Sequence, residues 1–260
     1  MIKLLQRTCG LAGCLAGLAL LTGCAGPQRA KDINANLDSY LDKEFTIAYV
    51  SPGLRSKIND VGLTAPSPAK EITMKFNQRV KLLGDQTEKI AQPEFRLRNL
   101  GGGYYQDIRD IQNNGYLATR FVYLTWAGLL PLKAEQLASD RDFPIPTGEV
   151  KDITPFKFNP SQLKTGDRFN YEFKIGSRPQ AFNLGSERAD CVVDNVAPAS
   201  QLHRSVPGTG VWISCDMAVE RGQPSKNKAV FLVDYGYAVF TEFRSPSRTS
   251  TYELIDFAVK

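Results

Sequence analysis

The chain has 260 residues, of which 32 are basic and 27 are acidic, and its formal net charge is +5. This charge is mild and no block of Lys and Arg stands out, so the composition does not support nucleic-acid binding. Aromatic residues make up 10% of the chain, which is too many for a disordered linker protein. The length is sufficient for one large domain or two small ones with a hydrophobic core.

The first residues have the pattern of an export signal. Lys3 and Arg7 supply positive charge ahead of an uncharged apolar run over residues 11–21. That run is shorter than the roughly 20 apolar residues that a transmembrane helix needs. We therefore expect the segment to direct export and then to be removed.

The apolar run ends in the motif Leu21-Thr22-Gly23-Cys24. This motif resembles the lipobox of bacterial lipoproteins, which implies cleavage before Cys24 and attachment of acyl chains such as palmitate to that cysteine. Ala25 follows the cysteine, where lipoproteins kept in the inner membrane have Asp, so the resemblance implies an outer-membrane anchor facing the periplasm. The alternative is an ordinary signal peptide that is cut elsewhere.

We divide the chain into four parts on composition and pattern. Residues 1–23 are the lipoprotein signal peptide, and residues 24–31 are polar enough for a tether. Residues 32–155 form a mixed α/β region, and residues 156–260 form an antiparallel β region. The expected fold class is therefore α+β, with short N-terminal helices and strands followed by a β sandwich or barrel-like C-terminal part.

The N-terminal half contains helical and strand patterns. Residues 32–43 have apolar side chains at positions 33, 37, 40 and 41, which is the spacing of an amphipathic helix. Residues 45–50 predict a short strand. In residues 72–83, apolar side chains at positions 72, 76, 80 and 83 favour a helix, while the alternation at 72, 74 and 76 leaves a strand as the alternative.

The middle of the chain is marked by glycines, asparagines and prolines. Gly101-Gly102-Gly103 predicts a turn, and Asn113-Asn114-Gly115 predicts a hairpin turn before a strand at 117–126. Residues 132–138 favour a short helix, and the prolines between 144 and 155 predict a boundary or long loop.

The last hundred residues alternate between apolar and polar positions in short runs. Turn residues separate these runs at the spacing of a meander, sandwich or barrel. The expected strands cover residues 167–175, 189–194, 211–217, 229–234, 237–243 and 252–259.

Two cysteines remain in the body of the chain once the signal is removed. Cys191 and Cys215 both lie in β-patterned segments, and the export signal places them in an oxidising compartment. We therefore predict a disulfide between them that joins neighbouring strands or the loops at their ends. The alternative is a pair of separate buried thiols.

The sequence gives little support for catalysis. Its single histidine, His203, would need a serine and an acid, and no Gly-x-Ser-x-Gly motif occurs. One histidine also cannot build a zinc site, and we expect no metal and no cofactor. A hydrolase stays open as an alternative, using residues drawn from Ser200, Ser205, Ser214, Glu187, Asp190, Asp194 and Asp216.

Aromatic side chains concentrate near the C-terminus. Core packing is the favoured interpretation, and a barrel cavity that holds a lipid or another apolar ligand is the alternative. The six aromatic residues are Tyr235, Tyr237, Phe240, Phe243, Tyr252 and Phe257.

From these features we expect a non-enzymatic binding or scaffold component of the cell envelope. Its partners would be the membrane, through the lipid on Cys24, and an envelope protein, with no role for nucleic acid. The first alternative is a β-barrel carrier of lipid or lipopolysaccharide, and the second is an envelope hydrolase.

Overall fold

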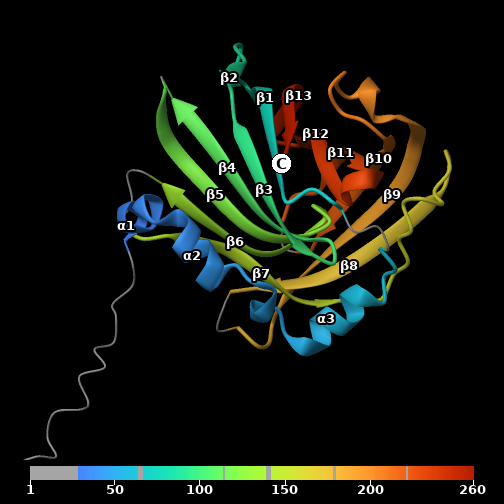
Figure 1. The fold of residues 1–260 in the computed structure, drawn as a ribbon, viewed down its shortest axis with the longest axis horizontal. Helices are drawn as coiled ribbons and strands as arrows, with labels where there is room; N and C mark the ends of the chain where they lie inside the picture. The colour runs from blue at the N-terminus through green and yellow to red at the C-terminus, as the bar shows by residue number, and fades with distance from the viewer. Residues whose placement is uncertain (1–28, 64–66, 114, 139–141, 178–179, 221) are drawn as a thin grey trace, which may run out of the picture.

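The computed structural model describes residues 29–63, 67–113, 115–138, 142–177, 180–220 and 222–260. Cys24 and the lipobox lie outside these residues. Short helices come first and β-strands follow to the C-terminus (Figure 1). The helices are α1 (Ala30–Ala35), α2 (Leu37–Glu44) and α3 (Pro52–Asn59), with 3-10 turns η1 (Ile47–Tyr49), η2 (Ala199–Gln201) and η3 (Val233–Tyr235).

Thirteen strands form one antiparallel sheet, in which most neighbours in sequence are also neighbours in space. The strands are β1 (Glu71–Leu82), β2 (Lys89–Ala91), β3 (Glu94–Gly101), β4 (Tyr104–Asn113), β5 (Tyr116–Trp126), β6 (Leu130–Ala138), β7 (Ile145–Ile153), β8 (Arg168–Gly176), β9 (Gly185–Pro198), β10 (Thr209–Val219), β11 (Ser225–Leu232), β12 (Tyr237–Ser245) and β13 (Arg248–Val259).

The sheet closes on itself because β1 pairs with β3 on one side and with β13 on the other. The β1–β13 seam runs from the pair Ile72–Val259 to the pair Leu82–Arg248. The result is a barrel of 12 strands, with β2 added beside β1 at its far end. The expected N-terminal helices and antiparallel strands are confirmed, and the choice left open between sandwich and barrel is decided for a barrel.

Four local predictions were wrong. Residues 72–83 form β1 and not a helix, and residues 132–138 lie in β6 and not in a helix. Residues 45–50 contain the 3-10 turn η1 in place of a strand, and the proline-rich loop contains β7. The strands expected at 117–126 and after residue 166 are all present.

The pairing of β12 with β13 covers only part of the two strands. β12 and β13 pair along residues 242–245 and 248–251, next to their shared turn. Further along β12, the backbone N–H of Ala238 donates to Ala127 O in the β5–β6 turn, at 2.9 Å. Ala127 and Gly128 both have positive φ there, and a Cβ on Gly128 would come within 2.7 Å of Ala238 O. This close approach requires glycine at position 128.

The N-terminal helices pack against the sheet, with α1 touching β6 and α3 touching β7 (Figure 1). Apolar side chains at 33, 37 and 41 are buried, as the amphipathic pattern predicted, and so are those at 54 and 58 of α3. Ser51 begins α3, because its Oγ accepts a hydrogen bond from Leu54 N and Pro52 occupies the first turn. Within the described residues, no helix is long and apolar enough to cross a bilayer.

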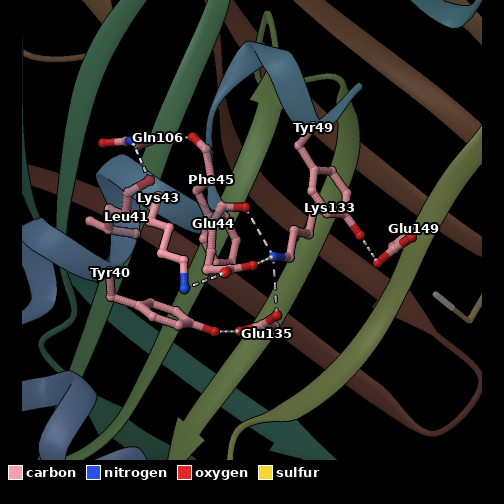
Figure 2. Close-up of polar contacts among 10 residues, drawn as sticks. All are labelled: Tyr40, Leu41, Lys43, Glu44, Phe45, Tyr49, Gln106, Lys133, Glu135 and Glu149. Carbon is pink, nitrogen blue, oxygen red and sulfur yellow. Dashed lines mark hydrogen bonds and ion pairs between the residues drawn. The ribbon is translucent and has the colours of Figure 1, made fainter. Parts of the chain in front are cut away.

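A buried lysine of β6 fastens α2 to the barrel (Figure 2). Lys133 is 1% exposed, and its Nζ donates to Glu44 O at 2.9 Å. Carboxylate oxygens of Glu44 and Glu135 lie 3.6 and 3.4 Å from the same nitrogen. The ammonium also lies 4.3 Å from the ring centroid of Phe45 and 4.5 Å from that of Tyr49. Two carboxylates, a carbonyl and two aromatic faces thus compensate for the desolvation of one buried charge.

Candidate functional site

A cavity of about 510 Å³ lies inside the curved wall that runs from β5 through the β1–β13 seam to β11. These strands come from both halves of the chain and meet only because the barrel closes. Aromatic side chains dominate the lining, which consists of Gln78, Pro93, Phe95, Arg109, Ile111, Phe121, Tyr123, Asn227, Phe240, Phe243, Arg248 and Tyr252.

The floor of the cavity rests on a buried ion pair. Arg109 Nη2 donates to Asp107 at 2.6 Å, and Arg109 Nε donates to the same carboxylate at 3.0 Å. Tyr237 Oη donates to Asp107 at 2.7 Å. Asp107 is fully buried, so both of its partners are needed to compensate for its desolvation. Burial together with the Asp107 charge raises the pKa of Tyr237 well above its ordinary value, so this phenol stays a donor at neutral pH.

The guanidinium of Arg109 lies within cation–π distance of two aromatic rings. Its Cζ lies 4.7 Å from the centroid of Phe95 and 4.6 Å from that of Tyr123. Tyr123 stands opposite Asp107 in the β4–β5 pairing, and Phe121 stands opposite Arg109. Burial raises the pKa of Tyr123, so this side chain is also neutral. The floor therefore carries a charge pair that is neutral overall and covered by rings.

The mouth of the cavity lies where β1, β4 and β12 end. There the Arg248 guanidinium stands 4.9 Å from the ring centroid of Phe243. On the wall, Gln78 Nε2 donates to Tyr252 Oη at 2.8 Å across the seam. Asn227 is paired with Phe243 between β11 and β12. Its Oδ1 is buried and accepts no hydrogen bond from the described residues.

The predicted aromatic group is divided between cavity and core. Phe240, Phe243 and Tyr252 line the cavity. Tyr235, Tyr237 and Phe257 are buried in a hydrophobic cluster together with side chains of β1 and β3. Core packing is therefore confirmed for three of these aromatics, and the other three line a cavity.

Sequence reasoning missed the half of the site that comes from β3, β4 and β5. Phe95, Arg109, Phe121 and Tyr123 were not singled out, although positions 105, 107 and 109 alternate as a strand does. An arginine between two aromatic residues in neighbouring strands becomes recognisable only when the strand register is known. The register pairs Phe95 with Arg109 between β3 and β4.

The proposed hydrolase residues do not gather at this cavity. His203 Nδ1 lies 2.7 Å from Ser205 Oγ in the loop after η2, and Ser214 Oγ donates to Asp194 at 2.5 Å. Asp190 stands opposite Asp216 between β9 and β10, and each carboxylate pairs with a basic neighbour, Arg188 and Lys226 respectively. Glu187 is the candidate whose pKa is raised, and burial is the cause.

The predicted disulfide is present. Cys191 of β9 stands directly opposite Cys215 of β10, with the two Cα atoms 4.1 Å apart. The bridge thus joins neighbouring strands, as the β patterns on either side of it predicted. Cys191 packs in the larger hydrophobic cluster, with Cys215 beside it.

A scan of known family models finds no match to this sequence, and a search of curated proteins finds none either. Among solved structures, the chain is similar to a LolA superfamily protein from Nitrosomonas europaea, with 8% sequence identity and a TM-score of 0.38. The alignment covers 81% of this chain and 94% of that one. We therefore base the function on the cavity alone.

Proposed function

We propose that the protein is a carrier that holds one amphiphile with a single acyl chain inside its barrel. The observation that carries this proposal is the aromatic cavity between β5 and β11. Ligand sites typically enclose roughly 300–1,000 Å³, are mostly apolar and contain a few placed polar groups. A volume of about 510 Å³ with Phe95, Phe121, Phe240 and Phe243 in its lining meets each of these conditions.

Within this proposal the lipid on Cys24 would keep the carrier at the outer membrane, on the periplasmic side. Two or more acyl chains anchor a protein stably, and the tether at residues 24–31 would leave the barrel close to the bilayer. An acyl ligand leaving or entering a membrane would then meet the barrel at high local concentration.

The scaffold hypothesis has weaker structural support. Its best feature is the β1–β2 hairpin, where Leu83 is 82% exposed and Ile90 is 71% exposed. Partner-binding surfaces are usually marked by contiguous apolar patches of several hundred Å². Two side chains on one hairpin form less than that, so we rank the carrier first.

A cavity-filling variant tests the carrier proposal. Ile111 lines the cavity near its mouth, so Ile111→Trp should weaken the binding of N-phenyl-1-naphthylamine, a neutral apolar fluorophore, at least about tenfold. Ile255→Trp is the matched control, because Ile255 is 39% exposed on β13 and is not part of the lining. Thermal unfolding of both variants shows that each is folded. Equal affinity in the wild type and in Ile111→Trp would contradict the proposal.

A further inference from the structure

The charges around the cavity are not balanced. Two of its lining residues, Arg109 and Arg248, are cationic, and the described lining contains no carboxylate. An apolar ligand without charge would need neither arginine. The two arginines differ in whether they are available to a ligand.

Arg109 is already committed to the protein. Its guanidinium donates to Asp107 through Nε and Nη2, and the carboxylate is fully buried beneath it. Removing Asp107 from this pair to bind a ligand anion would leave an uncompensated charge in the barrel interior, which is strongly destabilising. Arg109 is therefore a structural residue of the cavity floor, where it contacts the rings of Phe95 and Tyr123, and it is not available to a ligand anion.

Arg248 has the opposite status. It lies at the β12–β13 turn with its guanidinium over Phe243, and it forms no ion pair with any described acidic residue. Its hydrogen bonds with Ser245 involve the backbone N–H and carbonyl of Arg248, not the guanidinium. The contact with Phe243 keeps the guanidinium at the mouth and leaves its N–H groups available to two oxygens of a carboxylate or phosphate.

A second polar group points to the same end of the cavity. Asn227 stands opposite Phe243 in the β11–β12 pairing, and its buried Oδ1 accepts no hydrogen bond from the described chain. A buried acceptor that is left unsatisfied keeps the full cost of its desolvation. A headgroup hydroxyl or the protonated oxygen of a phosphate monoester would satisfy it, whereas an ionised carboxylate has no proton to donate.

We infer that the ligand is an anionic amphiphile, whose carboxylate or phosphate pairs with Arg248 at the mouth while its chain lies along Phe121 and Phe240 toward the floor. This inference rests on the proposed carrier function and specifies the ligand class of the same cavity. A single anion at the mouth balances Arg248, and the Arg109–Asp107 pair needs none. Carboxylate and phosphate share this chemistry, and the experiment separates them.

Four probes with the same 12-carbon chain test the inference, each below its micelle concentration. They are dodecanoate, dodecyl phosphate, neutral monolauroyl glycerol and cationic dodecyltrimethylammonium, and each competes with N-phenyl-1-naphthylamine. We expect the anions to bind about five- to tenfold more tightly than the neutral lipid, with the cation weakest. The better of the two anions identifies the headgroup.

Arg248→Gln should remove that preference by weakening the anions about five- to tenfold relative to monolauroyl glycerol. Arg248→Lys keeps the charge but not the planar fork, so it should retain part of the preference. Arg204→Gln is the control, because Arg204 is exposed in the loop after η2, away from the cavity lining. Equal binding of all four probes, or an anion preference that survives Arg248→Gln, would overturn the inference but leave the carrier function standing. Binding of none of the probes would overturn the carrier function itself.

Discussion

At Lys133 a charged side chain sits at the interface between β6 and α2, almost entirely out of contact with water. Breaking a buried ion pair by removing one partner costs about 3–5 kcal/mol, because the other charge stays buried without compensation. Lys133→Met removes the ammonium but keeps much of its volume. Glu44 would keep its ion pair with Lys43 and Glu135 would keep its hydrogen bond from Tyr40, but neither carboxylate would have the buried ammonium beside it.

We expect Lys133→Met to lower the free energy of unfolding by about 3 kcal/mol, measured by urea denaturation at pH 7. Lys228→Met is the matched control on β11, where the lysine side chain is 58% exposed, and it should change stability by less than about 0.5 kcal/mol. Adding Glu135→Gln to Lys133→Met should recover part of the loss. Similar stability for Lys133→Met and Lys228→Met would show that the cluster does not hold α2.

Glu187 provides a pH-dependent test at the same scale. Burial raises the pKa of Glu187 in the folded protein, so the folded state binds its proton more tightly than the unfolded state does. Stability is then highest below the unfolded pKa and falls as the pH rises through the folded pKa. At higher pH the carboxylate is charged in both states, and its burial then lowers the free energy of unfolding by an amount that no longer changes with pH.

Glu187→Gln removes the charge and should stabilise the protein at pH 7, with little difference from the wild type at pH 3.5. Denaturation midpoints measured between pH 3.5 and 7 give the two curves. Asp216→Asn is the control, because it removes the charge of a carboxylate that is exposed and paired with Lys226. A Glu187→Gln variant less stable than the wild type at pH 7 would mean that the charged form is favoured in the fold.

At the scale of elements, the disulfide couples two strands that the chain connects through η2. With a sequence separation of 24 between the cysteines, the chain-entropy model gives a stabilisation of about 3.5 kcal/mol. The double variant Cys191→Ala/Cys215→Ala should lose a comparable amount under oxidising conditions and nothing further on adding reductant. Mass spectrometry without reductant should show the purified wild type two hydrogens lighter than its reduced form. Two alkylatable thiols in folded wild-type protein would contradict the bridge.

The strands that were predicted correctly are those whose apolar residues fit the two-residue repeat of a strand but not the repeat of a helix. The segment of β8 alternates through Phe169, Tyr171 and Phe173, and no helical spacing competes with it. In β1 the helix and strand patterns cannot be distinguished, because residues 72, 76 and 80 are spaced by four and would share one face of either a helix or a strand. Long-range pairing with β3 and β13 makes this segment a strand, and the local residue pattern carries no information about that pairing.

Tertiary contacts also overrode local preference in β6 and β7. Residues 132–138 are rich in helix-forming Leu, Ala, Lys, Glu and Gln, yet they pair with β5 on one side and β7 on the other. Pro146 lies within β7, although proline has no backbone N–H to donate to a neighbouring strand. It is accommodated because the β6–β7 register shifts between Ala134 and Glu135, where Pro146 stands opposite Glu135.

For the molecule as a whole, the closure of the barrel could not be read from the sequence. It depends on pairing β1 with β13, which lie near opposite ends of the described chain. The cavity follows from that closure, because Gln78 and Tyr252 meet across the seam and Arg109 faces residues of β12 only when the ring is complete. The C-terminal aromatics were therefore predicted as a group, but their partners from β3 to β5 were not.

Anchoring and ligand binding should be separable in this molecule. The cavity is built from residues 78–252, whereas the proposed lipid attachment is at Cys24, before the first described residue. Cys24→Ala should abolish fatty-acid labelling and leave the precursor unprocessed by the lipoprotein route, so that the chain no longer fractionates with the outer membrane. The folded body, expressed from residue 25, should still bind N-phenyl-1-naphthylamine as tightly as the acylated protein does, because no cavity residue is altered. A Cys24→Ala chain that still labels with palmitate in the outer-membrane fraction would refute the lipobox. Loss of probe binding in the unacylated body would instead mean that the protein's own acyl chains contribute to the occupied cavity.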